Sequence, residues 1–202
     1  YTAAGYDEWA SGCGKRKLYP LFNIEFIGLS EKDRQAGIRI NDPANPGRIY
    51  LSGKGLTYPF RLLEPYASLL EGVRNETDRQ VKAMCEKLNG ILETEEVGFT
   101  LDFDRIKKEL TKGMVRERHL AKALRMKVYE ICGEDKEGIK VMLEKIFGGK
   151  SLRASVENIA EVENEIRSNL LKAGGRAFVP EDAKAFLSIE TICEIVLAAG
   201  GI

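Results

Sequence analysis

The middle of the chain, residues 58–173, carries one helical pattern after another, and this limits the fold more than any other feature. In the longest pattern, residues 60–93, apolar side chains recur at intervals of three and four, as on one face of a helix. The apolar positions include Val81, Met84, Cys85, Leu88 and Leu92. Pro65 indicates that this helix begins or bends there, because proline lacks the amide hydrogen of an internal helix residue.

Four shorter helical patterns follow in this region. They occupy residues 101–113, 115–133, 136–149 and 151–175. Asp102 is expected to cap the first, since a short acidic side chain accepts hydrogen bonds from the free amides of a helix start. Gly133 and Gly174 are expected to end the second and the fourth, because glycine readily adopts the left-handed conformation of a helix end.

The last part of the chain has a mixed pattern. Residues 176–180 are expected to be extended, and residues 187–201 to form a final helix that Ser188 caps and Gly200 ends. Ile202 resembles the first residue of a further strand. Because the chain also begins without methionine, the sequence is interpreted as a piece of a longer protein.

The first 57 residues are the other mixed region. A short helix is expected in residues 6–17, and a strand rich in aromatic and branched side chains in residues 18–29. Two further strands are expected around Ile38–Ile40 and Arg48–Leu51, with a turn at Asp42–Gly47, where proline, asparagine and glycine gather. Strand patterns on both sides of the helices indicate a helical insertion in a β/α fold.

Glu25 is a single carboxylate inside the first strand pattern, on the opposite face from Ile24 and Phe26. Burying an isolated carboxylate costs several kcal/mol, so a buried Glu25 would be paired, hydrogen-bonded or bound to a metal. Hard divalent cations favour such oxygen ligands. If only one face of the strand is buried, Glu25 instead lies in solvent, and the residue pattern by itself favours this simpler interpretation.

His119 is the only histidine, and it lies in a basic helical segment. Arg118, Lys122 and Arg125 are spaced to share one helix face, with His119 at its edge. Such a face can bind phosphate through charge-assisted hydrogen bonds. The alternative is an ordinary solvated face, which the residue pattern alone favours.

The charges of the chain balance, with 31 lysines and arginines against 31 aspartates and glutamates. General affinity for nucleic acid needs a basic excess, so none is expected, although a local patch stays open. The four cysteines are far apart and lack a C-x-x-C partner, so buried, reduced thiols are expected. No secretory signal and no apolar run of about 20 residues is present, which predicts a cytoplasmic protein without a membrane span.

Four segments together resemble the PHP (polymerase and histidinol phosphatase) family of metal-dependent phosphoesterases, in the branch that has a helical insertion in its barrel. Residues 2–9 resemble the segment after that family's Asp-His metal motif, and residues 23–29 resemble its Gly-(Val/Ile)-Glu strand. Residues 115–124 resemble the insertion helix that carries Arg-Pro-His, and residues 174–202 resemble the return to the barrel. The resemblance spans nearly the whole chain.

The resemblance implies an α+β, mostly helical fold, namely a fragment of a PHP-type β/α barrel with few short strands and a helical insertion domain. Residues 1–57 would form a partial barrel segment, residues 58–173 the insertion, and residues 174–202 the return to the barrel. A barrel fragment and an inserted helical domain are therefore the expected organisation.

The resemblance also implies a reaction and a site. The family hydrolyses phosphate esters with bound divalent metal ions, which could be Mn, Zn, Fe or Mg. Its substrates are phosphorylated small molecules, nucleotides or nucleic-acid ends. By the matching positions, Glu25 would be a metal ligand, and Arg118, His119 and Lys122 would bind the substrate phosphate. No residue is assigned as the catalytic acid or base.

Several positions depart from the family pattern. Asn23 replaces the glycine before the Ile-Glu pair, Glu117 stands where arginine is usual, and Arg118 stands where proline or glycine is usual. The family's His-x-His, Asp-His and later histidine motifs would lie before Tyr1 and after Ile202. The isolated chain is therefore expected to be nearly inactive, without tightly bound metal. The alternative is a non-catalytic binding or regulatory module derived from the same fold.

Overall fold

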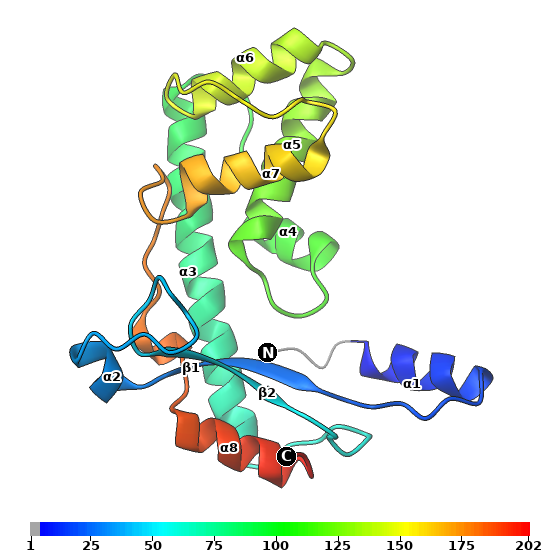
Figure 1. Ribbon diagram of the computed structural model, residues 1–202. Helices are drawn as coiled ribbons and strands as arrows, with labels where there is room; N and C mark the ends of the chain where they lie inside the picture. Colours follow the sequence, from blue (N-terminus) through cyan, green and yellow to red (C-terminus); the bar gives the residue numbers. More distant parts are fainter. Residues whose placement is uncertain (1–4) are drawn as a thin grey trace. The chain divides into compact units, whose positions relative to one another are not determined.

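The structure is a computed structural model that describes residues 5–202 (Figure 1). Helices make up 53% of it and strands 7%, which confirms the predicted α+β, mostly helical class. Contacts between residues divide the chain into two compact units. The sheet unit comprises the residues up to Glu76 and Asp182–Ile202, and the helical unit comprises Thr77–Glu181. The helical unit begins and ends later than the predicted insertion, residues 58–173.

The sheet unit contains two antiparallel strands, β1 (Ile24–Leu29) and β2 (Arg48–Gly53), and their register pairs Ile24 with Gly53. The first helix, α1 (Tyr6–Lys15), confirms the expectation for residues 6–17. Both strands occur where they were predicted, although β1 occupies only the second half of its apolar stretch. Of the segment at residues 2–9, residues 2–4 lie outside the described part of the chain.

Helix α8 (Ile189–Ala198) packs on one face of this sheet (Figure 1). Most of the buried apolar residues of the sheet unit form one cluster there. They are Phe22, Ile24, Phe26, Leu56, Leu70, Ile192, Ile195, Val196 and Ala199. The contact is close enough to require glycine at Gly53, since a Cβ atom there would lie 2.6 Å from Val196 Cγ2.

The ends of α8 are as predicted. The Ser188 side chain accepts a hydrogen bond from the Thr191 backbone N–H at 3.1 Å. At the other end Gly200 has a φ of 75° and donates to the Leu197 carbonyl, and the N–H of the next residue donates to the Val196 carbonyl. This is the Schellman pattern that glycine permits. Ile202 then exchanges two backbone hydrogen bonds with Lys54, as paired residues of antiparallel strands do.

The strand predicted around Ile38–Ile40 is wrong, because these residues lie in a loop. They follow a short helix that was not expected, α2 (Glu31–Gln35), which the Ser30 side chain caps. Beside β2, the Asn41 side chain forms the two hydrogen bonds that a neighbouring strand would form with Tyr50. The Asn41 amide donates to the Tyr50 carbonyl at 3.0 Å, and its oxygen accepts from the Tyr50 N–H at 2.8 Å.

The turn predicted at Asp42–Gly47 is present, and its first residue organises it. The Asp42 carboxylate accepts hydrogen bonds from the backbone N–H groups of Ala44 and Asn45 and from the Asn45 side chain. Burial raises the pKa of Asp42, but these hydrogen bonds outweigh it and hold the pKa below its ordinary value. The turn is therefore closed by a buried, ionised carboxylate.

The long helix α3 (Tyr66–Thr94) begins directly after Pro65, as the sequence predicts. The helical unit adds α4 (Phe103–Leu110), α5 (Glu117–Cys132), α6 (Lys136–Ile146) and α7 (Ile159–Ile166). The expected cap at Asp102 is present, with its carboxylate 2.9 Å from the Arg105 backbone nitrogen. The expected end of α5 at Gly133 is present as well.

The helix predicted over residues 151–175 is shorter than expected, because α7 begins only after Asn158, whose side chain caps it. Before that point the Glu165 carboxylate accepts hydrogen bonds from the backbone N–H groups of Arg153 and Ala154, which holds the chain in a non-helical conformation. After Ile166 the helix continues as one π-helical turn, Arg167–Leu171.

Helix α5 lies at the centre of the helical unit and packs against α4, α6 and α7. Leu120, Leu124 and Val128 on its inner face are completely buried, as is Leu88 of α3. The remaining buried positions of this core come from every helix of the unit. Hydrophobic burial therefore stabilises this unit, while exposed ion pairs such as Arg105 with Glu109 contribute little.

All four cysteines are free, but the expectation that all are buried is wrong. Cys13 and Cys85 are buried, Cys132 is half-buried, and Cys193 is exposed on α8. Burial, together with the charges of neighbouring carboxylates, raises the pKa of the Cys85 thiol to about 11. Among the described residues no helix is long and apolar enough to cross a membrane.

Truncating the core of the helical unit should destabilise it more than removing a surface charge. Leu88→Ala and Leu124→Ala are each expected to lower the free energy of unfolding by about 2–5 kcal/mol, because both side chains are completely buried. Met126→Ala, at an exposed position of α5, is the matched control. Arg105→Gln, which breaks the exposed ion pair with Glu109, should cost at most about 1 kcal/mol.

Urea denaturation followed by circular dichroism measures these differences. If Arg105→Gln or Met126→Ala lowers stability as much as Leu124→Ala, the ranking is wrong.

Candidate functional site

Glu25 lies on the face of β1 opposite the buried core. Ile24 and Phe26 are buried beneath α8, whereas Glu25 and its cross-strand partner Ser52 are exposed. The exposed position that the residue pattern by itself favours is thus confirmed, and the alternative of a buried, partnered Glu25 is wrong. The reason is that the core beneath α8 lies on one face of the sheet, and alternate side chains of β1 lie on the other face, where Glu25 is exposed and Ile27 and Leu29 are half-buried.

An exposed carboxylate of this kind can offer oxygen atoms to a hard cation. Within residues 5–202, however, no group of three or more histidine, cysteine, aspartate or glutamate side chains lies together in a way that could hold a metal ion. Glu25 would thus supply one ligand of a larger set.

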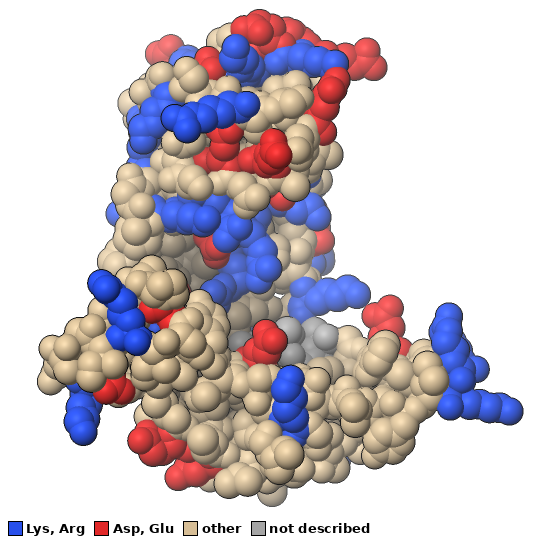
Figure 2. All heavy atoms as spheres, viewed as in Figure 1, with Lys and Arg blue, Asp and Glu red and all other residues tan. Residues whose placement is uncertain are grey.

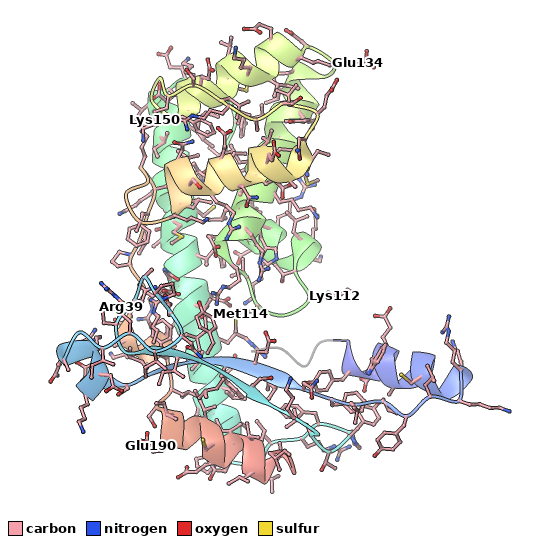
Figure 3. The ribbon with its side chains drawn as sticks, viewed as in Figure 1. Arg39, Lys112, Met114, Glu134, Lys150 and Glu190 are labelled. Carbon is pink, nitrogen blue, oxygen red and sulfur yellow. The ribbon has the colours of Figure 1, made fainter. Side chains whose placement is uncertain are left out.

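The second candidate region is the first turn of α5, in the helical unit. The loop that leads into it passes Lys112 and Met114 (Figure 3). Arg116 occupies the capping position, and its backbone N–H donates a hydrogen bond to His119 Nδ1 at 2.9 Å. His119 thus takes the position that glutamate or glutamine has in a capping box. The sequence did not predict this role.

This hydrogen bond determines the form of the imidazole. Because Nδ1 accepts a hydrogen bond, it carries no proton, and the neutral ring has its hydrogen on Nε2. Partial burial lowers the pKa of His119, and the positive charges of Arg118, Lys122 and Arg116 lower it further, while Glu117 opposes them. At neutral pH His119 is therefore an uncharged hydrogen-bond donor through Nε2.

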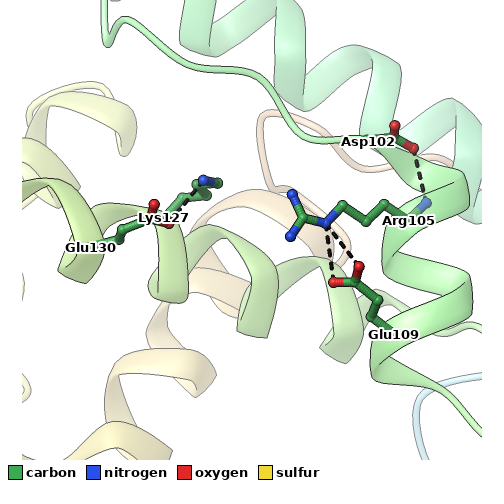
Figure 4. A network of polar contacts seen from close by, with 5 residues as sticks. All are labelled: Asp102, Arg105, Glu109, Lys127 and Glu130. Atoms are coloured by element: carbon green, nitrogen blue, oxygen red, sulfur yellow. Dashed lines mark hydrogen bonds and ion pairs between the residues drawn. The ribbon is translucent and has the colours of Figure 1, made fainter.

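The basic face predicted on α5 is only partly available, because Arg125 is engaged. Its guanidinium donates to Glu163 Oε1 from Nε at 3.1 Å and from Nη2 at 3.0 Å, and lies over the Tyr129 ring. Lys127 forms an ion pair with Glu130 at 2.8 Å, one turn before the end of the helix (Figure 4). Neither side chain is free to bind a ligand without giving up its partner.

Arg118 and Lys122 differ from these two cations. Both are exposed, and within residues 5–202 neither forms an ion pair or hydrogen bond. They lie four residues apart, on neighbouring turns of one face, where like charges repel each other. The structure thus places Arg118, His119 and Lys122 together at the start of α5, as the spacing predicts, and the described part of the chain supplies no counter-ion for the two positive charges.

The rest of the helical unit does not extend this charge. Figure 2 shows lysine and arginine side chains interleaved with aspartate and glutamate over the visible face of that unit. On α4, Arg105 Nε donates to both carboxylate oxygens of Glu109 at 3.1 Å (Figure 4). On this face basic and acidic side chains are therefore mixed, and the two charges of Arg118 and Lys122 suit a small anion.

Sequence reasoning missed one cation of this region, Arg167. It is the first residue of the π-helical turn after α7, and π-helical turns occur often at functional sites. Its Nη2 donates to Glu117 Oε1 at 2.8 Å, and Glu117 Oε2 lies 4.0 Å from Arg116 Nε. Fifty positions separate Arg167 from Glu117 in the chain, so no local pattern could have paired them.

Comparison of this chain with models of protein families, with curated proteins and with solved structures finds no match. The resemblance to the PHP family thus rests on the four sequence segments.

The cap that His119 provides should make stability depend on pH. His119→Ala is expected to lower the free energy of unfolding by about 1 kcal/mol at neutral pH, because the Arg116 N–H loses its acceptor. His119→Gln should preserve most of the stability, since glutamine serves in capping boxes. Because the folded pKa of His119 is lowered, its contribution is complete above about pH 6.5 and is lost as the pH falls below that value.

Thermal melts at about pH 7.5 and about pH 5 measure both effects. Acidification should reduce the melting temperature of the wild type more than that of His119→Gln, which does not titrate. Equal losses in the two proteins would show that Nδ1 does not act as the acceptor.

Proposed function

We propose that this chain is part of a PHP-type metal-dependent phosphoesterase and that the start of α5 binds the phosphate group of its substrate. The observation that carries the proposal is the pair of exposed cations, Arg118 and Lys122, which have no counter-ion within the described residues and lie beside the Nε2 donor of His119. Arginine and lysine bind phosphate oxygens through short, charge-assisted hydrogen bonds. A dianionic phosphate group would relieve the repulsion between the two cations.

In this proposal the sheet unit is the partial barrel segment, and α3 to α7 form the helical insertion. The antiparallel pairing of β1 with β2 differs from the parallel pairing of strands within a β/α barrel, so at most one of the two is a barrel strand. Glu25 fits a metal site by its chemistry and exposure, and the other ligands would come from elsewhere in the intact protein. A bound divalent ion would supply an activated water and stabilise charge on the phosphoryl oxygens. Arg118 and Lys122 would orient the phosphate, and His119 would donate a hydrogen bond from Nε2. A phosphorylated small molecule or nucleotide as substrate and a cytoplasmic location are parts of the same proposal.

A non-catalytic phosphate-binding or regulatory module is the second candidate. It is favoured by the finding that no set of three metal-ligating side chains lies together in the described part of the chain. The two candidates share the anion site on α5 and differ in hydrolysis. An assay of the intact protein with Mn²⁺ and a panel of phosphate esters separates them.

Removing the unpaired cations should weaken phosphate binding. Arg118→Ala and Lys122→Ala are each expected to lower the affinity for inorganic phosphate by roughly tenfold or more, because each removes a charge-assisted hydrogen bond. Lys127→Ala is the matched control, since it removes a paired cation from the same helix. Isothermal titration calorimetry measures all three, and equal affinities for Arg118→Ala and Lys127→Ala would contradict the proposed site.

Removing the carboxylate of Glu25 should abolish metal-dependent turnover in the intact protein while the fold persists. Glu25→Gln keeps the shape of an exposed side chain but loses the charge that holds a divalent ion. Glu194→Gln, which alters an exposed carboxylate on α8, is the control. Turnover of Glu25→Gln within a few-fold of the control would show that Glu25 is not a ligand. In the isolated chain Mn²⁺ should bind only weakly, because one carboxylate gives little affinity.

A further inference from the structure

Glu117 separates the cations at the start of α5 into two groups. It engages Arg167 through a hydrogen bond of 2.8 Å and lies 4.0 Å from Arg116, whereas Arg118 and Lys122 have no ion-pair partner within residues 5–202. Two positive charges are thus held by one carboxylate, and two remain available to an anion from solution.

Glu117 keeps its negative charge at neutral pH. Partial burial raises its pKa, but the hydrogen bond from Arg167 and the positive charges of Arg116 and Arg167 outweigh burial and lower it. The side chains of Arg116, Glu117 and Arg167 are 32%, 25% and 27% exposed, so each is partly accessible to solvent.

We infer that Glu117 restricts this site to a single phosphate group. The inference rests on the proposed function, because it concerns the same anion site. One phosphate monoester carries nearly two negative charges near neutral pH, and the charges of Arg118 and Lys122 balance them. A second, adjoining phosphate group needs further cations, and Arg116 and Arg167 beside this turn are already engaged by Glu117.

The electrostatic consequence is selectivity by charge. A pyrophosphate that approaches Arg116 and Arg167 meets the carboxylate of Glu117, so it must either displace this carboxylate or bear the repulsion. A single phosphate group bound at Arg118 and Lys122 neither displaces the Glu117 carboxylate nor has to bear its repulsion. Glu117 is therefore a specificity-determining residue, and it needs no direct contact with the substrate to act.

Binding of inorganic phosphate and of pyrophosphate to the chain tests this inference by isothermal titration calorimetry. The wild type should bind phosphate more tightly than pyrophosphate, because the Glu117 carboxylate repels the second phosphate group. Glu117→Gln should raise the affinity for pyrophosphate relative to phosphate about tenfold, because it releases two cations that can each donate a charge-assisted hydrogen bond. Glu130→Gln is the matched control, since it removes one negative charge from the same helix and releases Lys127 instead.

Two further variants assign the effect. Glu117→Gln combined with Arg167→Met should lose most of the gain for pyrophosphate. Arg167→Met alone should leave the affinity for phosphate within about twofold of the wild type, because Arg167 is engaged with Glu117. Arg167→Met alone keeps the test decisive if Glu117→Gln proves unstable in a thermal melt.

The outcomes separate this inference from the proposed function. An unchanged ratio of the two affinities in Glu117→Gln, an equal gain in Glu130→Gln, or a large loss of phosphate binding in Arg167→Met would overturn the role of Glu117 and leave the phosphate site standing. A failure of the wild type and every variant to bind either anion would overturn the phosphate site itself, and this inference with it.

Discussion

The complete burial of one face of α5 is the constraint on which the helical unit depends. Leu120, Leu124 and Val128 are inaccessible to solvent, and α4, α6 and α7 all pack against this helix. A helix held on so many sides has only a narrow outward face left for polar side chains. Arg118 and Lys122 lie on that outward face, so the packing of the hydrophobic core fixes the positions of the two cations.

The same packing explains which cations are not available. Neighbouring helices bring Glu163 to Arg125, and the π-helical turn brings Arg167 to Glu117. Both of these partly buried arginines thus have a carboxylate partner, which offsets the cost of removing their charges from water. At the first turn of α5, Arg118 and Lys122 have no ion-pair partner within residues 5–202, and His119 there accepts a hydrogen bond from the backbone and stays neutral. The local charge of this turn depends on tertiary contacts as much as on composition.

The sheet unit follows a simpler rule. A two-stranded sheet needs one covered face, and α8 supplies the cover for Ile24 and Phe26. Every second residue of β1 is therefore directed away from the core, and Glu25 is one of these. Because Glu25 is exposed, its carboxylate stays hydrated and carries no desolvation cost. Its oxygens are also accessible to a ligand.

The sequence by itself determined the helices and most of their ends, because periodic apolar residues, Pro65, Asp102, Ser188 and the terminal glycines act through local geometry. It also placed both strands and brought His119 next to two cations of one helix face. Only the tertiary structure decided which faces are buried and which charges are paired. The pairing of Arg167 with Glu117, the loss of Arg125 from the basic face and the exposure of Glu25 all depend on contacts between residues far apart in the chain. No local pattern records such contacts, since they form only when the helices pack.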